Sequence, residues 1–76
     1  MLITYHGRNE IEVELGDYVY YKTVDGNVHE GTLLKVERPV WPRNITYVSL
    51  LGGGGMKRIN THLIFWFENL IKVRDL

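Results

Sequence analysis

The chain of 76 residues contains no cysteine, which excludes a disulfide framework and any metal site built on thiolates. Its apolar runs are all far shorter than the ~18 residues that cross a bilayer. Residues 1–6 also lack the basic and apolar segments with which a signal peptide begins. We therefore expect a cytoplasmic protein that neither enters nor spans a membrane.

Net charge is absent as well, because nine Lys and Arg residues balance nine Asp and Glu residues. The chain therefore lacks the overall basicity of many nucleic-acid-binding domains. Residues 1–38 carry four basic and seven acidic side chains, whereas residues 39–76 carry five basic and two acidic ones. We expect either a surface with two oppositely charged sides or, if folding interleaves the two halves, a mixed surface.

Residues suited to metal binding or catalysis are scattered along the chain. The three histidines are His6, His29 and His62, and they lie on separate segments. None of them has a second metal ligand two positions away, where it would lie on the same face of a strand. The alternate glutamates of residues 10–14 share the solvent face of one expected strand, where such charges keep a sheet soluble. We therefore expect no enzyme, no metal, no cofactor and no small-molecule substrate.

Four consecutive glycines occupy residues 52–55 and are followed by Lys57 and Arg58, a combination that attracts anions. The Lys-Ser/Thr pair and the following helix of a P-loop are both missing. We interpret the glycines as the mobile tip of a hairpin, or as a tip that becomes ordered on meeting a partner.

The N-terminal part predicts a hairpin, with strands over residues 2–6 and 10–15 joined by a turn. Residues 10–15 alternate strictly between glutamate and apolar residues, which is the period of a half-buried strand. Ile11, Val13 and Leu15 are therefore expected to be buried.

A second hairpin is predicted from aromatic and β-branched residues over 18–24, turn residues at 25–27 and a return strand over 28–37. Gly31 within the return strand indicates a bulge or a bend. Such a bend would allow the sheet to close.

The second half of the chain predicts a loop, a third hairpin and an irregular end. Two prolines make residues 39–42 a loop, after which residues 45–51 and 56–60 form two strands. Residues 61–76 fit no single period, and one helix is an alternative there. Our prediction is a helical turn near residues 62–67, a break at 68–69 and a last strand over 70–74.

Gly16 and Asp17 precede Val19, the turn at 25–27 follows, and Gly31 stands two residues before Leu33. This pattern resembles the opening of small SH3-like barrels of the KOW and Tudor kind. In those barrels a Gly-Asp pair starts the first strand and a glycine lets the second strand curve.

The resemblance covers roughly residues 16–74. It implies a mostly β chain that forms one domain: an SH3-like barrel of about five strands over residues 16–76, with an extra hairpin over residues 1–15. A short helical turn would precede the last strand. Short chains of this fold are common among phage and prophage accessory proteins, so the resemblance also implies such an origin.

Aromatic residues are too numerous for the interior of so small a barrel. Eight of them lie beyond the first hairpin: Tyr18, Tyr20, Tyr21, Trp41, Tyr47, Phe65, Trp66 and Phe67. Alternation places Val19 and Tyr21 on one face of their strand and Tyr18 and Tyr20 on the other. If the first face is the core, the second is exposed, either to bind a partner or simply to cover the sheet.

We expect a non-catalytic protein-binding module, or a small regulatory or structural subunit, whose partner is another protein or a second copy of the chain. Aromatic and arginine side chains are enriched at the centres of protein interfaces. The residues expected to bind the partner are Tyr18, Tyr20, Trp41 and Tyr47 as anchors, with Arg38 and Arg43 around them.

The alternative is a nucleic-acid-binding barrel of the KOW type, in which cations contact phosphates and aromatic rings stack on bases. The cations it would use are Lys35, Lys57 and Arg58, together with Arg38 and Arg43. A third interpretation, implied by the likeness to Tudor domains, is an aromatic cage for a methylated side chain.

Overall fold

The chain forms seven strands and one short 3-10 helix in the computed structural model, which describes residues 1–6, 8–38 and 45–70. The elements are β1 (Leu2–Tyr5), β2 (Asn9–Glu12), β3 (Tyr18–Thr23), β4 (Val28–Glu37), β5 (Tyr47–Gly52), β6 (Gly55–Asn60), the 3-10 helix η1 (Thr61–Leu63) and β7 (Ile64–Asn69). The prediction of a mostly β chain is therefore confirmed. The predicted loop over residues 39–42 lies outside the described residues.

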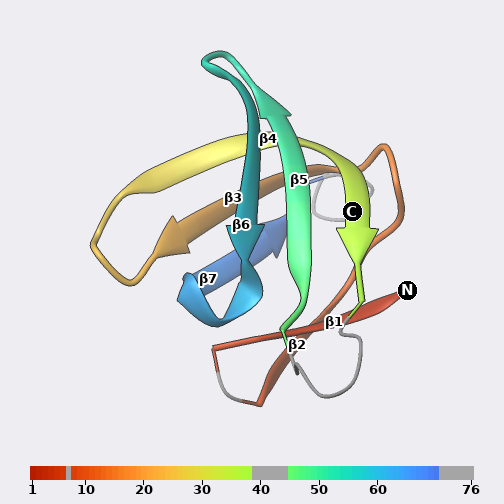
Figure 1. The fold of residues 1–76 in the computed structure, drawn as a ribbon, viewed down its shortest axis with the longest axis vertical. Coiled ribbons are helices and arrows are strands. Elements are labelled where there is room, and N and C mark those ends of the chain that lie inside the picture. The colour runs from red at the N-terminus through yellow and green to blue at the C-terminus, as the bar shows by residue number, and fades with distance from the viewer. Residues whose placement is uncertain (7, 39–44, 71–76) are drawn as a thin grey trace.

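Five strands make one antiparallel sheet in the order β6-β5-β4-β3-β7, and β1 and β2 pair separately (Figure 1). Within the described part of the chain no ladder joins β6 to β7, so this sheet does not close on itself. The SH3-like barrel expected from the sequence stays a prediction. No helix of the described ranges is long and apolar enough to cross a membrane.

Strand β4 is long and sharply curved (Figure 1). Residues 28–32 of β4 pair with β3, whereas residues 32–37 pair with β5. Gly31 lies at this change of partner, where an added Cβ would stand 2.7 Å from the carbonyl oxygen of Leu51. The register shift falls between Leu33 and Lys35. Gly31 thus allows a close approach of two backbones, and the predicted bulge lies a few residues later.

The N-terminal hairpin buries only part of the predicted apolar face. Val13 is completely buried and Ile11 partly so, but Leu15 is 58% exposed, and its predicted burial is wrong. The cause is a tight turn at residues 14–17, in which the Asp17 amide donates to the Glu14 carbonyl at 3.1 Å. This turn ends the alternation before Leu15 can follow it.

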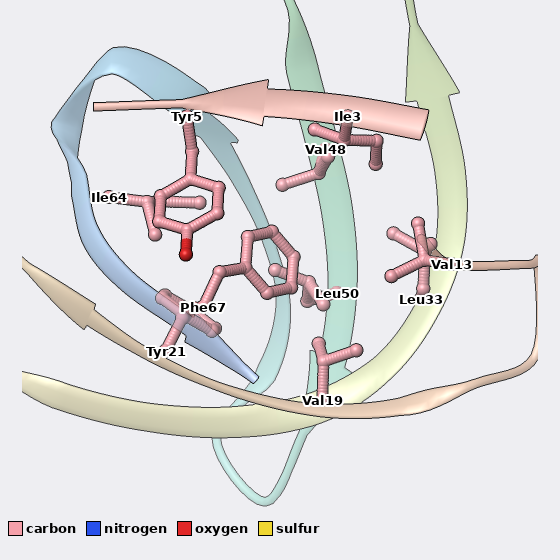
Figure 2. Packing of buried hydrophobic residues seen from close by; sticks show 10 residues of the cluster. All are labelled: Ile3, Tyr5, Val13, Val19, Tyr21, Leu33, Val48, Leu50, Ile64 and Phe67. Atoms are coloured by element: carbon pink, nitrogen blue, oxygen red, sulfur yellow. The ribbon is translucent and has the colours of Figure 1, made fainter. Parts of the chain in front are cut away.

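The hairpin and the five-stranded sheet share one apolar cluster, shown in Figure 2. Its members are Ile3, Tyr5, Val13, Val19, Tyr21, Leu33, Val48, Leu50, Ile64 and Phe67. The Phe67 ring lies between two aromatic neighbours, with ring centroids 5.8 Å from Tyr5 and 6.3 Å from Tyr21. Burial of Val19 and Tyr21 confirms the predicted inner face of β3.

The segment after β6 begins with a short helical turn before a strand, as predicted, but this turn is shorter and lies earlier than the predicted residues 62–67. Only residues 61–63 form a 3-10 turn, which Asn60 caps by accepting a hydrogen bond from the His62 amide at 2.9 Å. Strand β7 then pairs with β3 as far as Asn69, so the predicted break at residues 68–69 is wrong. The predicted last strand over residues 70–74 falls almost entirely outside the described residues.

A register shift between Lys22 and Thr23 explains why this segment has no clean period. Trp66 lies opposite Lys22 and Ile64 opposite Thr23, so Phe65 is an extra residue in β7. As a result Ile64 is buried while both Phe65 and Trp66 are exposed. The bulge turns two consecutive large rings away from the core.

Candidate functional site

A shallow groove of about 310 Å³ lies on the outer face of β3 and β7. It is lined by Tyr20, Lys22, Phe65, Trp66 and Glu68, and we call it the aromatic groove. The sheet register sets its rows, because Trp66 stands opposite Lys22 and Glu68 opposite Tyr20. Phe65 and Trp66 are 53% and 49% exposed.

The N-terminal hairpin contacts one wall of the aromatic groove. The His6 ring meets the Phe65 ring edge-on, at a centroid distance of 5.4 Å and an interplanar angle of 70°. His6 has a positive φ of 39°, and its amide donates to the Thr61 carbonyl at 3.4 Å. A local backbone turn thus places a ring against one wall of the groove.

Sequence reasoning did not include Phe65 and Trp66 among the binding residues, because it assigned them to a helical turn. The available signal was the apolar run over residues 63–67, which is too long for one buried face of a strand. Its outward members could be identified only from the pairing of β7 with β3.

The predicted partner-binding residues do not meet at one place. Tyr20 lines the aromatic groove, and Tyr18 is half-buried further along the same face of β3. Tyr47 lies on β5, away from both. Arg38 donates to the carbonyl of Leu2 at 3.1 Å, so it ties the first hairpin to the end of β4. Trp41 and Arg43 lie outside the described residues.

Tyr47 belongs to a separate polar cluster with Arg58 and Glu37. The Arg58 guanidinium carbon lies 3.7 Å from the centre of the Tyr47 ring. Two parallel hydrogen bonds of 2.9 Å join the same guanidinium to both carboxylate oxygens of Glu37. This bidentate contact lowers the pKa of Glu37 and raises the pKa of Arg58.

Removal of Arg58 should return the pKa of the Glu37 carboxyl toward its ordinary value of 4.5. Because the folded-state pKa is lowered, the pair stabilises the fold above that value and loses its contribution as the pH falls through the lowered pKa. Both groups are exposed, so salt should weaken the effect. A carbon-13 NMR titration of Glu37 in the wild type and in Arg58→Ala measures the shift.

Lys57→Ala is the matched control for that titration, since it removes a neighbouring cation that lies on the opposite face of β6. It should leave the Glu37 pKa where it is in the wild type. An unchanged Glu37 pKa in Arg58→Ala would show that the two hydrogen bonds do not form in solution.

The cations proposed for nucleic-acid binding are divided between the two faces of the sheet. Lys35, Ser49 and Arg58 form one row across β4, β5 and β6, which places Lys35 and Arg58 on the same face. Lys57 pairs with the buried Leu50 and therefore lies on the other face. The Arg58 charge is also already matched by Glu37, so the basic surface that phosphates require is not assembled there.

Lys57 instead contacts His29 beside the glycines of residues 52–55, with 3.3 Å between Lys57 Nζ and His29 Nδ1. The His29 ring stacks on Tyr21 at a centroid distance of 5.2 Å, and burial raises the pKa of the Tyr21 hydroxyl. These side chains and residues 52–55 border a cavity of about 130 Å³.

Across residues 1–6, 8–38 and 45–70, no cluster of three or more histidine, aspartate or glutamate side chains could hold a metal ion. Among the surfaces described above, the aromatic groove exposes the largest rings. No family model matches this chain, and neither a curated protein nor a solved structure matches it significantly.

Proposed function

We propose that this chain is a non-catalytic protein-binding module that holds its partner through the aromatic groove. The observation that carries the proposal is the outward placement of Phe65 and Trp66, each about half exposed, beside Tyr20. Large rings exposed next to one another are costly in water and are enriched among the residues that dominate protein interfaces.

The rim of the groove favours a partner with an apolar anchor and mixed charge around it. Lys22 and Glu68 contribute one cation and one anion to the same groove. Opposite charges at a rim orient a partner and reject wrong ones more than they add to affinity. The partner is another protein or a second copy of this chain, located with it in the cytoplasm.

We also propose that the five-stranded sheet is an SH3-like barrel of the open kind. Support comes from the strand order β6-β5-β4-β3-β7, from a long β4 that pairs with β3 and then with β5, and from a 3-10 turn just before β7. Such a scaffold presents binding residues on rigid strands. A phage or prophage origin stays a prediction from the resemblance.

Selection of binders from a random-peptide display library tests the proposed function. Peptides enriched on the wild type should bind Trp66→Ala at least about tenfold more weakly, since a buried tryptophan anchor contributes well over 1 kcal/mol. Leu15→Ala is the control, because Leu15 is a similarly exposed apolar residue, at 58%, outside the groove.

Equal binding of the selected peptides by wild type and Trp66→Ala would contradict the proposal. So would tight binding of mixed single- and double-stranded nucleic acid with a steep dependence on salt, which is the signature of phosphate contacts. Sedimentation velocity at rising protein concentration distinguishes a second copy from a different protein as the partner.

A further inference from the structure

Strand β6 lies at one edge of the sheet, and its pairing shows which of its backbone groups face outward. Thr61, immediately after β6, donates its amide to the Thr46 carbonyl at 3.0 Å. Antiparallel ladders alternate between hydrogen-bonded and non-bonded pairs. Counting back from this bonded pair, Ile59, Lys57 and Gly55 also direct their backbone groups toward β5.

The remaining residues of β6 therefore direct their amide and carbonyl groups away from the sheet. These residues are Met56, Arg58 and Asn60. Among the residues that the structure describes, no other backbone forms hydrogen bonds with the amide and carbonyl groups of Met56 and Arg58. Asn60 contributes only its amide to the free edge, because its carbonyl accepts the first bond of the 3-10 helix η1 that it caps. An edge of this kind is a template for another strand.

A groove of about 600 Å³ runs beside this free edge. Its near wall includes Arg58, Ile59 and Asn60 of β6, and its far wall includes Val24 and Leu63. The far wall is held in place by a backbone hydrogen bond of 2.9 Å from the Val24 amide to the Leu63 carbonyl. Val24 and Leu63 are 55% and 50% exposed, so apolar surface faces the free edge.

The charges around the groove favour a basic occupant. The positive charge of Arg58 is matched by both oxygens of Glu37, each at 2.9 Å. Asp25 also lines the groove, and the hydrogen bond from Thr23, followed by the one from the Asn27 backbone, lowers its pKa, so it is ionised at neutral pH. Among the described residues no Lys or Arg side chain forms an ion pair with Asp25, which therefore supplies a negative charge at the far wall.

We propose that the free edge of β6 binds an extended segment of another protein as an added strand, in which apolar and basic side chains alternate. The backbone of the segment satisfies the outward groups of Met56 and Arg58 and the amide of Asn60. Its apolar side chains contact Val24 and Leu63. This site is separate from the aromatic groove, so either can exist without the other.

Hydrogen exchange with a synthetic probe tests the added strand. The probe is an eight-residue peptide with blocked ends and with valine and lysine at alternate positions. In the free protein the amides of Met56, Arg58 and Asn60 should exchange fast while those of Lys57 and Ile59 are protected. The peptide should slow exchange at the first three and leave the other two unchanged.

Two variants that both remove the Arg58 side chain isolate the backbone contact. Arg58→Pro also removes an outward N–H, a change that an edge strand tolerates, whereas Arg58→Ala keeps this donor. Arg58→Pro should bind the probe about tenfold more weakly than Arg58→Ala. It lacks the outward N–H of residue 58 and disturbs the backbone hydrogen bonds that the probe forms on either side of this residue. If Arg58→Pro does not fold, the same comparison on the wild type uses a probe that is N-methylated at alternate residues.

Several results would overturn the proposal. The first two are no binding at a millimolar concentration of the probe, and binding that brings no new protection at β6. The other two are a methylated probe, or a probe with glutamate in place of lysine, that binds as tightly as the original probe. Protection of the β6 edge that grows with protein concentration alone would assign the edge to a second copy. Trp66→Ala should leave binding of the probe unchanged, which separates this test from that of the aromatic groove.

Discussion

Replacement of Phe67 by alanine is expected to leave most of the molecules unfolded. Phe67 is 4% exposed and packs against Tyr5 of the first hairpin and Tyr21 of β3. Truncation of a buried phenylalanine costs about 3–5 kcal/mol, from lost apolar burial and from the cavity that remains. A single core in a domain of this size supplies only about 3–5 kcal/mol of net stability.

Phe65→Ala is the matched control, because it removes the same side chain two residues earlier in the same strand. Phe65 is 53% exposed and contacts His6 at the edge of the hairpin, so its loss should cost about 1 kcal/mol or less. Urea unfolding followed by circular dichroism measures both variants. Similar free energies of unfolding for the two variants would show that β7 does not bury Phe67 and expose Phe65, and hence that its register against β3 differs from the one described.

Gly31→Ala is expected to have the second largest effect, about 1–3 kcal/mol of lost stability. The added Cβ would stand 2.7 Å from the carbonyl oxygen of Leu51 and 2.9 Å from its carbonyl carbon. Both are backbone atoms of β5, so the clash can be relieved only by moving β4 and β5 apart. Thermal unfolding of the variant measures the loss.

Gly53→Ala provides the control for this substitution. Its Cβ would meet no atom within 4 Å, and Gly53 does not have a positive φ. The free energy of unfolding should therefore change by less than about 0.5 kcal/mol. A Gly31→Ala protein as stable as Gly53→Ala would contradict the close approach of β4 and β5.

The two proposed binding surfaces differ in how each recognises a partner. The aromatic groove offers side-chain rings, so its specificity depends on the shape of an apolar anchor. The free edge of β6 offers backbone groups, so it accepts many sequences of extended conformation and selects them by charge. Each surface has its own variants and probes, and failure of one proposal leaves the other standing.

Part of the candidate site could be predicted from the sequence, and part could not. Tyr20 was predicted on the outer face of its strand from alternation alone, and it lines the aromatic groove. Phe65 and Trp66 were missed because the bulge that exposes them arises from the pairing of β7 with β3. Arg58 was predicted as a phosphate contact, yet its charge is matched by Glu37, which lies 21 residues earlier in the chain.

The sequence by itself determined six of the seven strand-forming segments, all but β7, together with most of the turns between them and the inner face of β3. These depend on local physics: alternation of apolar residues, and glycine or asparagine where the backbone must reverse. The tertiary structure alone decided the exposure of Leu15, the bulge at Phe65 and the free edge of β6. The bulge and the free edge result from pairing between residues far apart in the chain, whose register no local pattern contains. The turn at residues 14–17 that exposes Leu15 is held to β4 by a hydrogen bond from the Gly16 amide to the Leu33 carbonyl.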